Sequence, residues 1–381
     1  MNILRKYVLI VCCPIIFLSC GEKRDKVERN YENGVEIVLN HLEPYKTPGM
    51  RSLVLEELFR IDSENSEIVK LGLNDIRGFE VSSGGEIFVL RTVKGEGNFV
   101  FKFDKDGHFV KSFGPKGQGP GEIEIPFHIA LDHEDDIYIT DSGRSMTAKY
   151  DQNGSFVTDY RRAGADVRVT SGPGRKLAVL ENSFDGENSR QLFFLKLANH
   201  DLEGRTPIDQ YSFEMRRDKF RATEPLFCWS ASRDHLFVAN EEWGYEIRVY
   251  EDAGKLIRKI RKDYRKMPFS EGEKKKILGQ FPEAMRALTY FPEFHPPFQS
   301  LVAGDDGMLF VPTFEQGSSP GEFLVDIFNK DGLFIARGNL NTYVWEGHFW
   351  ARLKSDRFYC LREKDSGYKE IVVYSARWDE G

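Results

Sequence analysis

Short apolar runs with alternating polar residues recur along most of the chain. The clearest unit begins with Ile87-Phe88-Val89, continues with a second run over 101–103 and reaches a third run after the Asp106-Gly107 turn. A second copy extends from Ile137 to Val157 around Asn153-Gly154. The alternation predicts half-buried strands, and Asp-Gly or Asn-Gly supplies the positive φ values of a tight hairpin turn. Each unit is therefore predicted to be a small antiparallel meander.

The meander repeats with a nearly regular period. Weaker copies begin at Leu177, Leu236 and Leu309, and a sixth begins at Phe358. The turn glycines lie at positions 107, 154, 204, 254 and 332, so the gaps are 47, 50, 50 and 78 residues. The last gap fits one repeat plus an insertion of about 30 residues. One meander cannot bury both of its faces, whereas a closed ring of meanders can. We predict an all-β, six-bladed β-propeller over residues 51–381.

The two ends of the repeat array indicate how such a ring closes. The last copy ends with its third strand at 370–374, and a fourth strand is missing there. The segment Glu67–Gly72 resembles Phe109–Gly114, the fourth strand of a complete unit. We predict that 67–72 completes the sixth blade. The alternative is an unrelated edge strand.

The insertion, residues 267–297, has a helical pattern. Ser270 and Glu273 form a capping-box pattern ahead of a helix over 274–281, which Pro282 ends. A second short helix is predicted over 283–290. With its apolar side chains, this pair is expected to lie on one face of the ring, either as a lid over a central pocket or as packing for a loop.

The N-terminus has the pattern of an export signal. Arg5 and Lys6 precede the apolar stretch Tyr7–Leu18, which is too short to span a bilayer. The sequence Leu18-Ser19-Cys20-Gly21 resembles the lipobox of bacterial lipoproteins. We therefore expect a signal peptide over 1–19 and a lipid on Cys20. The alternatives are a plain secretory signal or an uncleaved anchor helix.

This assignment predicts a protein of the cell envelope, anchored in the outer membrane and facing either the periplasm or the surface. The polar residues of 20–50 are expected to form a tether, which a short strand around 35–39 could interrupt. The membrane, reached through this lipid, is thus a predicted partner.

Composition narrows the function classes. Hydrophobic residues make up 40% and charged residues 30%, as in ordinary globular proteins. With 53 basic and 60 acidic side chains the net charge is −7, which disfavours nucleic acid as a partner. We expect a monomer. After loss of the signal peptide and lipidation of Cys20, Cys228 and Cys360 remain, and we expect small core residues there, with a disulfide as the alternative.

A resemblance to a known family supports the propeller. The run Phe113–Ile123, with its glycines at 114, 117, 119 and 121, resembles the signature between blades of NHL-repeat propellers. Together with the lipobox-like sequence, the insertion and the phrase Pro296-Pro297-Phe298, it is similar to the six-bladed β-propeller lipoproteins of Bacteroidota. The resemblance covers residues 50–381 and implies the fold. It implies no catalytic residues.

Two local motifs do not support specific chemistry. The glycines of 114–121 lack the Gly-Lys-Ser/Thr ending of a P-loop and fit an inter-blade turn. The acidic run 132–136 lacks EF-hand spacing and fits a hairpin tip. No metal site and no cofactor are predicted, and catalytic residues are unknown.

The repeat itself points to candidate ligand-binding residues. The innermost strand of each blade lines the central channel of a propeller, and its position is found by counting nine or ten residues back from the Ile87-type residue. This count lands near Arg77, His128, Arg168, Cys228, Gln299 and His348. We take Arg77, His128, Arg168, Gln299 and His348 as candidates, because a wet channel satisfies buried polar groups and would suit an anionic or carbohydrate ligand. A register error of one residue would instead point them into loops.

Two functions follow as expectations. The first is a binding or interaction module, without enzymatic activity, for a glycan, a peptide or a partner protein. The alternative is a metal-dependent propeller hydrolase or lyase of the lactonase type. The alternative needs carboxylate or Asn ligands that converge with His128 or His348, and the channel set contains no Asp or Glu.

Overall fold

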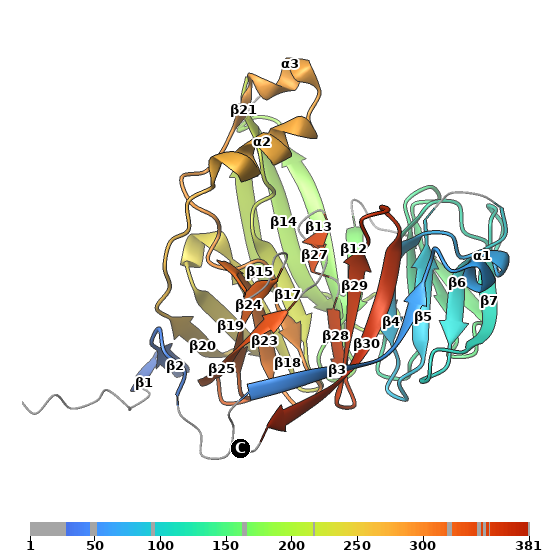
Figure 1. Cartoon of the computed structure of the whole chain (residues 1–381), viewed down its shortest axis with the longest axis horizontal. Coiled ribbons are helices and arrows are strands. Elements are labelled where there is room, and N and C mark those ends of the chain that lie inside the picture. The colour runs from blue at the N-terminus through green and yellow to red at the C-terminus, as the bar shows by residue number, and fades with distance from the viewer. Residues whose placement is uncertain are drawn as a thin grey trace, which may run out of the picture.

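The computed structural model describes residues 28–45, 52–92, 96–161, 166–215, 218–317, 322–340, 344–345, 348–349 and 351–379. The predicted signal peptide and Cys20 lie outside these residues. Within them, no helix has the length and apolar character needed to cross a membrane. Strands predominate, and they form antiparallel meanders of four strands (Figure 1).

Six such meanders follow one another along the described chain, and we number them blades 1 to 6. Blade 1 contains β4 (Ile76–Val81), β5 (Ile87–Arg91), β6 (Asn98–Phe103) and β7 (Phe109–Pro115). Blade 2 contains β8 (Pro126–Leu131), β9 (Ile137–Asp141), β10 (Met146–Tyr150) and β11 (Phe156–Arg161). Blade 3 contains β12 (Asp166–Ser171), β13 (Leu177–Asp185), β14 (Arg190–Ala198) and β15 (Thr206–Glu214).

The second half of the chain repeats this order. Blade 4 contains β17 (Phe227–Ala231), β18 (His235–Asn240), β19 (Glu246–Glu251) and β20 (Leu256–Lys262). Blade 5 contains β22 (Val302–Ala303), β23 (Leu309–Gln316), β24 (Phe323–Phe328) and β25 (Phe334–Leu340). Blade 6 contains β28 (Ala351–Lys354), β29 (Arg357–Glu363), β30 (Lys369–Asp379) and the N-terminal strand β3 (Ser52–Asp62).

The first strands of the blades face one another in ring order. Strand β4 contacts β8, β8 contacts β12, β17 contacts β22, β22 contacts β28, and β28 contacts β4. Strands β12 and β17 are joined by a 2.7 Å hydrogen bond from Trp229 Nε1 to Thr170 Oγ1. The ring is therefore closed, and the predicted six-bladed β-propeller is confirmed.

The ring closes through a different segment from the one predicted. Strand β3 pairs antiparallel with β30 from Ser52↔Asp379 to Asp62↔Glu370 and supplies the missing fourth strand of blade 6. The predicted segment 67–72 instead contains most of helix α1 (Ser66–Lys70). The Asn65 side chain accepts a hydrogen bond from the Glu67 N–H and caps this helix. The prediction relied on apolar residues that 67–72 shares with the fourth strand of blade 1. The Asn65 cap instead starts a helix there.

Part of the predicted tether belongs to the folded domain. Strands β1 (Glu28–Glu32) and β2 (Val35–Asn40) form a hairpin, and β2 pairs parallel with β20 at the outer edge of blade 4. The Asn40 amide donates to the Gly332 carbonyl at 3.0 Å, and its oxygen accepts from the Phe334 N–H at 2.8 Å. The strand expected near 35–39 is thus present, but it is paired with blade 4 and is not an isolated strand within a free tether.

The insertion forms the predicted pair of helices, the first beginning three residues earlier than expected and the second four residues shorter. Helix α2 spans Glu271–Gly279 and α3 spans Glu283–Arg286, and the Ser270 and Glu273 capping box is present. Strand β21 (Thr289–Tyr290) pairs with β16 (Phe220–Arg221), and the 3-10 helix η1 (Glu241–Trp243) follows β18. The insertion stands at the tip of the long β13–β14 hairpin (Figure 1). A small hairpin of β26 (Val344–Trp345) and β27 (His348–Phe349) precedes blade 6.

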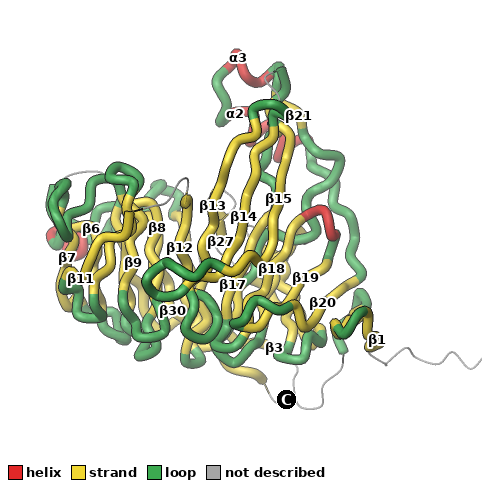
Figure 2. The backbone as a smooth tube through the Cα atoms, turned by 180° about the vertical axis from the view of Figure 1, so that it is seen from behind, coloured by secondary structure: helices red, strands yellow, loops and turns green. Residues whose placement is uncertain are grey.

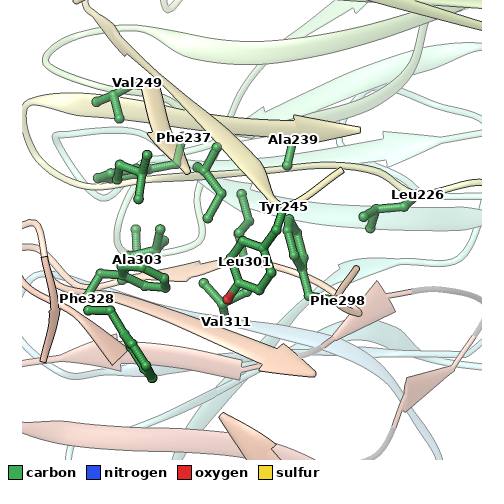
Figure 3. Packing of buried hydrophobic residues seen from close by; sticks show 14 residues of the cluster. Leu226, Phe237, Ala239, Tyr245, Val249, Phe298, Leu301, Ala303, Val311 and Phe328 are labelled. Atoms are coloured by element: carbon green, nitrogen blue, oxygen red, sulfur yellow. The ribbon is translucent and has the colours of Figure 1, made fainter. Parts of the chain in front are cut away.

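Apolar clusters between neighbouring blades form the core. The cluster between blades 4 and 5 is centred on Tyr245, whose ring lies 4.8 Å from that of Phe298 (Figure 3). The Tyr245 hydroxyl donates to Asp326 Oδ2 at 2.8 Å, which satisfies a buried polar group. Cys360 is buried, Cys228 is half-buried and both are free thiols, so they do not form a disulfide.

The turn glycines have the conformation that the repeat requires. Gly107, Gly154, Gly204, Gly254 and Gly332 have φ between 61° and 87°, in the turns between the third and fourth strands of blades 1 to 5. The acidic run 132–136 is a hairpin tip between β8 and β9, and the glycine-rich run links blades 1 and 2, both as predicted.

Candidate functional site

A cavity of about 130 Å³ lies where the innermost strands of the six blades meet. Blades 1 and 2 contribute Glu80 and His128, and blades 3 and 4 contribute Arg168 and Trp229. Blade 6 contributes Arg352 and Lys354. The cavity is thus lined by three basic side chains, one carboxylate and one indole, in addition to small and apolar groups.

Alternate residues of the inner strands of blades 3 and 4 form part of the cavity wall. Side chains of a strand alternate between its two faces, so Arg168 and Thr170 point the same way, as do Cys228 and Ser230. All four residues line the cavity. The opposite alternation brings apolar residues such as Val169 into the packing between blades.

Two of the predicted ligand-binding residues reach the cavity. His128 lies opposite Thr140 in the β8–β9 pairing, and Arg168 occupies the same place opposite Leu180 in β12–β13. Cys228, which the same count selected, lies opposite Ala239 and also lines the cavity.

Arg77 and Gln299 do not line the cavity, which corrects the prediction for both. The residue equivalent to His128 in blade 1 is Gly78, opposite Leu90, and Arg77 sits in a bulge just before it. Arg77 Nε donates to the Phe127 carbonyl at 2.8 Å. In blade 5 the neighbour Ser300 lines the cavity, whereas the Gln299 side chain donates to the Thr313 carbonyl. Both assignments are off by one, because they were counted ten residues back from Ile87 and Leu309, whereas His128 and Arg168 stand nine residues back in their blades.

His348 is also displaced from the predicted position. It belongs to β27, which pairs with β26 ahead of the innermost strand β28. Its side chain lies outside the described residues. In blade 6 the turn between the first two strands is shorter by one residue than in blade 1, as the pairs Leu353↔Phe358 and Val81↔Ile87 show.

Sequence reasoning missed an ion pair that crosses the seam between blades 6 and 1. Arg352 Nε donates to Glu80 Oε2 at 2.8 Å, and another guanidinium nitrogen donates to Oε1 at 2.5 Å. Burial alone would lower the pKa of Arg352, but the Glu80 carboxylate raises it above its usual value. A sequence signal existed, since Glu80 stands between the apolar residues Phe79 and Val81 within a buried strand.

Arg168 has a more demanding environment. Its guanidinium lies over the Trp229 ring, 5.4 Å from the ring centre, which is a cation–π geometry. Burial lowers the pKa of Arg168 to about 10, a shift that Glu224 opposes and Arg352 reinforces. The cation therefore lies in surroundings that favour the approach of negative charge.

Lys354 lies where this cavity meets a second one. A cavity of about 160 Å³ adjoins the hairpin tips at the other end of the inner strands, and both cavities are lined by Ser171, Ala231 and Lys354. Lys354 Nζ lies 2.9 Å from Asp305 Oδ1. The charge of Lys354 is consequently directed toward the second cavity.

The cavity offers little for nucleophilic or metal chemistry within the described residues. Burial raises the pKa of the Cys228 thiol well above its usual range, so the thiol stays protonated and weakly nucleophilic. In the described ranges no three His, Cys, Asp or Glu side chains gather to hold a metal ion.

Comparison with known proteins agrees with this architecture. The model of a family described as "6-bladed beta-propeller" (DUF5128) matches residues 72–215, which include the whole of blades 1 to 3. The strand topology, together with this match, shows a six-bladed β-propeller fold. No curated protein matches it.

The propeller is also similar to several solved structures at low identity. A putative exported protein from Bacteroides fragilis has 11% identity and a TM-score of 0.49, with 90% of this chain and 99% of that chain covered. A DUF4221 member from Bacteroides vulgatus has 12% identity and a TM-score of 0.49, with 86% and 99% covered. Virginiamycin B lyase from Staphylococcus aureus has 11% identity and a TM-score of 0.43, with 85% and 99% covered.

Proposed function

We propose that the propeller is a binding module of the cell envelope, held at a membrane by a lipid on Cys20, whose central cavity receives an anionic group of its ligand. Arg168 beside Trp229, on the cavity wall, carries this proposal. A ligand carboxylate is the natural match, because the planar guanidinium can donate two parallel hydrogen bonds to it.

Arg168 is the cation of the cavity that stands beside the Trp229 indole. Arg352 is engaged by both oxygens of Glu80, and Lys354 is engaged by Asp305. Arg168 is half-buried and lines the cavity. An anion that replaces water there would offset part of the cost of burying the cation.

Trp229 adds a flat apolar surface next to this charge. Its Nε1 donates to Thr170 Oγ1, which fixes the ring against the neighbouring blade. A ligand with a carboxylate and an adjoining ring or aliphatic face would satisfy both groups at once. Glycan, peptide and protein ligands all offer such combinations, and the expected monomer presents one such cavity.

The test is a titration with small anions, monitored through tryptophan fluorescence and calorimetry. Glucuronate and benzoate are compared with glucose and benzyl alcohol at low and moderate salt. We expect the two carboxylates to bind, with affinity that falls as salt rises, and the neutral molecules not to bind.

The matched variants are Arg168→Met and Arg175→Met. Arg175 is exposed on the hairpin that follows the same inner strand. We expect Arg168→Met to abolish binding and Arg175→Met to leave it unchanged. Carboxylate binding that survives Arg168→Met, or its absence in the wild-type protein, would overturn the proposal.

A further inference from the structure

A continuous row of aromatic rings leads away from the cavity along blade 3. Trp229 and Phe227 line the cavity with ring centres 6.1 Å apart, and Phe227 stacks on Tyr211 at 5.8 Å. Phe193 lies directly opposite Tyr211 in the β14–β15 pairing and stacks on Phe213 at 6.0 Å. We call these five residues, Trp229, Phe227, Tyr211, Phe193 and Phe213, the aromatic strip.

The outer half of the strip is not covered by the neighbouring blade. The β17–β18 pairing of blade 4 ends at Phe227↔Asn240, whereas β13, β14 and β15 continue and project beyond the other blades (Figure 2). Exposure rises accordingly along the projection. Tyr211 is buried, Phe193 and Phe213 are half-buried, and Phe184 near the tip is 57% exposed.

Amide side chains accompany the rings on the same face of the projecting sheet. Asn182 lies opposite Phe193, and Gln191 lies between Phe184 and Phe213 across the three strands. Residues opposite one another in a sheet share a face. The surface therefore alternates flat apolar rings with groups that donate and accept hydrogen bonds.

We infer that the ligand is an acidic oligosaccharide, with the carboxylate of one sugar at Arg168 and the following sugars stacked along the aromatic strip. This inference rests on the proposed function and adds the ligand class and a second part of the site. Charge complementarity places the acidic sugar, because the cationic groups lie in the cavity and the outer strip carries rings and amides.

The chemistry of the strip favours sugars over peptides. The apolar C–H face of a pyranose ring packs on a flat aromatic ring, and its hydroxyl groups suit adjacent amides. The two stacked pairs have interplanar angles of 18° and 23°. Tyr211 is buried, so the faces open to a sugar belong to the half-buried rings of the outer pair, Phe193 and Phe213.

The experiment measures affinity by calorimetry for galacturonate and for oligogalacturonides of two to five units. We expect affinity to rise at least tenfold from the single sugar to the tetramer. Phe184→Ser and Phe213→Ala should each remove at least fivefold from tetramer binding and leave galacturonate binding unchanged. Tyr31→Ala, which alters a ring that is 73% exposed on β1, is the control and should change neither.

The outcomes separate the two proposals. Galacturonate binding that depends on Arg168 would support the proposed function. If affinity then does not rise with added sugars, or if neither Phe184→Ser nor Phe213→Ala weakens tetramer binding, the role of the aromatic strip is overturned and the proposed function stands. A gain that appears only with peptides ending in a free carboxylate, and is lost in Phe184→Ser, overturns the oligosaccharide assignment. Absence of binding by every carboxylate overturns the proposed function and this inference with it. Because Phe184 is on the surface, we expect Phe184→Ser to fold, so the test can be made even if Phe213→Ala does not fold.

Discussion

The Glu80–Arg352 pair illustrates how costly charge is at the centre of the ring. The Glu80 side chain is 6% exposed and Arg352 is 24% exposed, and two hydrogen bonds join them. Glu80→Gln would leave the guanidinium without its counter-charge, so we expect a loss of roughly 2 to 4 kcal/mol in the free energy of unfolding. Urea denaturation measures it. Glu57→Gln, which breaks an exposed pair with Arg60, should cost under about 1 kcal/mol.

Asp209 predicts a pH-dependent stability. Burial raises the pKa of this carboxyl to about 6, although the Gln210 N–H and the Asn240 side chain oppose the shift. Because the pKa is higher in the folded state, the protonated Asp209 carboxyl contributes to the free energy of unfolding. This contribution is fully present below the unfolded pKa near 3.8 and is lost as the pH rises through 6.

Asp209→Asn should therefore stabilise the protein at pH 8 by about 1 to 2 kcal/mol, after allowance for solvent screening, and have little effect at pH 4. Denaturation of both proteins at pH 4, 5, 6.5 and 8 measures the difference. An equal difference at every pH would show that the Asp209 carboxyl does not titrate in this range.

At the same scale, the cavity could be predicted only in part. Counting back from the repeat located His128 and Arg168, where the count was nine residues, and missed the equivalent residues of blades 1 and 5, where it was ten. The count missed Glu80 and Arg352, since it sampled one position of each strand. Which of two adjacent residues faces the cavity depends on the strand register, which the sequence pattern alone does not determine.

At the scale of the element, β3 is the strand that ties the chain into a ring. Its inward residues pack into the core between blades 6 and 1, where Ile61 is 1% exposed beside Leu361 and Ile371. We expect Ile61→Ala to cost about 2 to 4 kcal/mol in the free energy of unfolding. Leu58→Ala changes the same strand at a side chain that is 46% exposed and should cost under about 0.5 kcal/mol. Similar costs for both in urea denaturation would mean that β3 is not part of the core.

Elements with strong local signals were predictable, and elements that depend on docking were not. The capping box at Ser270 fixed the start of α2 from four residues of sequence. Strand β2 was expected as an isolated strand, but its parallel pairing with β20 depends on partners more than 200 residues away, such as Arg258 and Arg261. The same distance explains why β3 was overlooked in favour of 67–72.

At the scale of the molecule, the repeat predicted the fold because every blade imposes the same local pattern. The deviations from symmetry were less accessible. Blade 3 has nine-residue strands where blade 2 has five or six, and this difference creates the projecting sheet beside the cavity. The extra residues of these blade 3 strands resemble ordinary strand sequence, so only the length of the strands distinguishes blade 3 from blade 2.

The docked β1–β2 hairpin also determines how a lipid on Cys20 would orient the propeller. Eight residue steps separate Cys20 from Glu28, a reach of at most about 28 Å. Because β1 lies on the outer edge of blade 4, that edge should face the bilayer, and β7 of blade 1 should lie on the far side of the ring. A fluorescent label at Tyr31→Cys should therefore transfer energy to an acceptor in vesicle headgroups much more efficiently than one at Lys111→Cys. The background carries Cys228→Ala and Cys360→Ala, and Cys20→Ser is the unlipidated control. Equal transfer from both labels, or transfer in the control, would contradict this orientation.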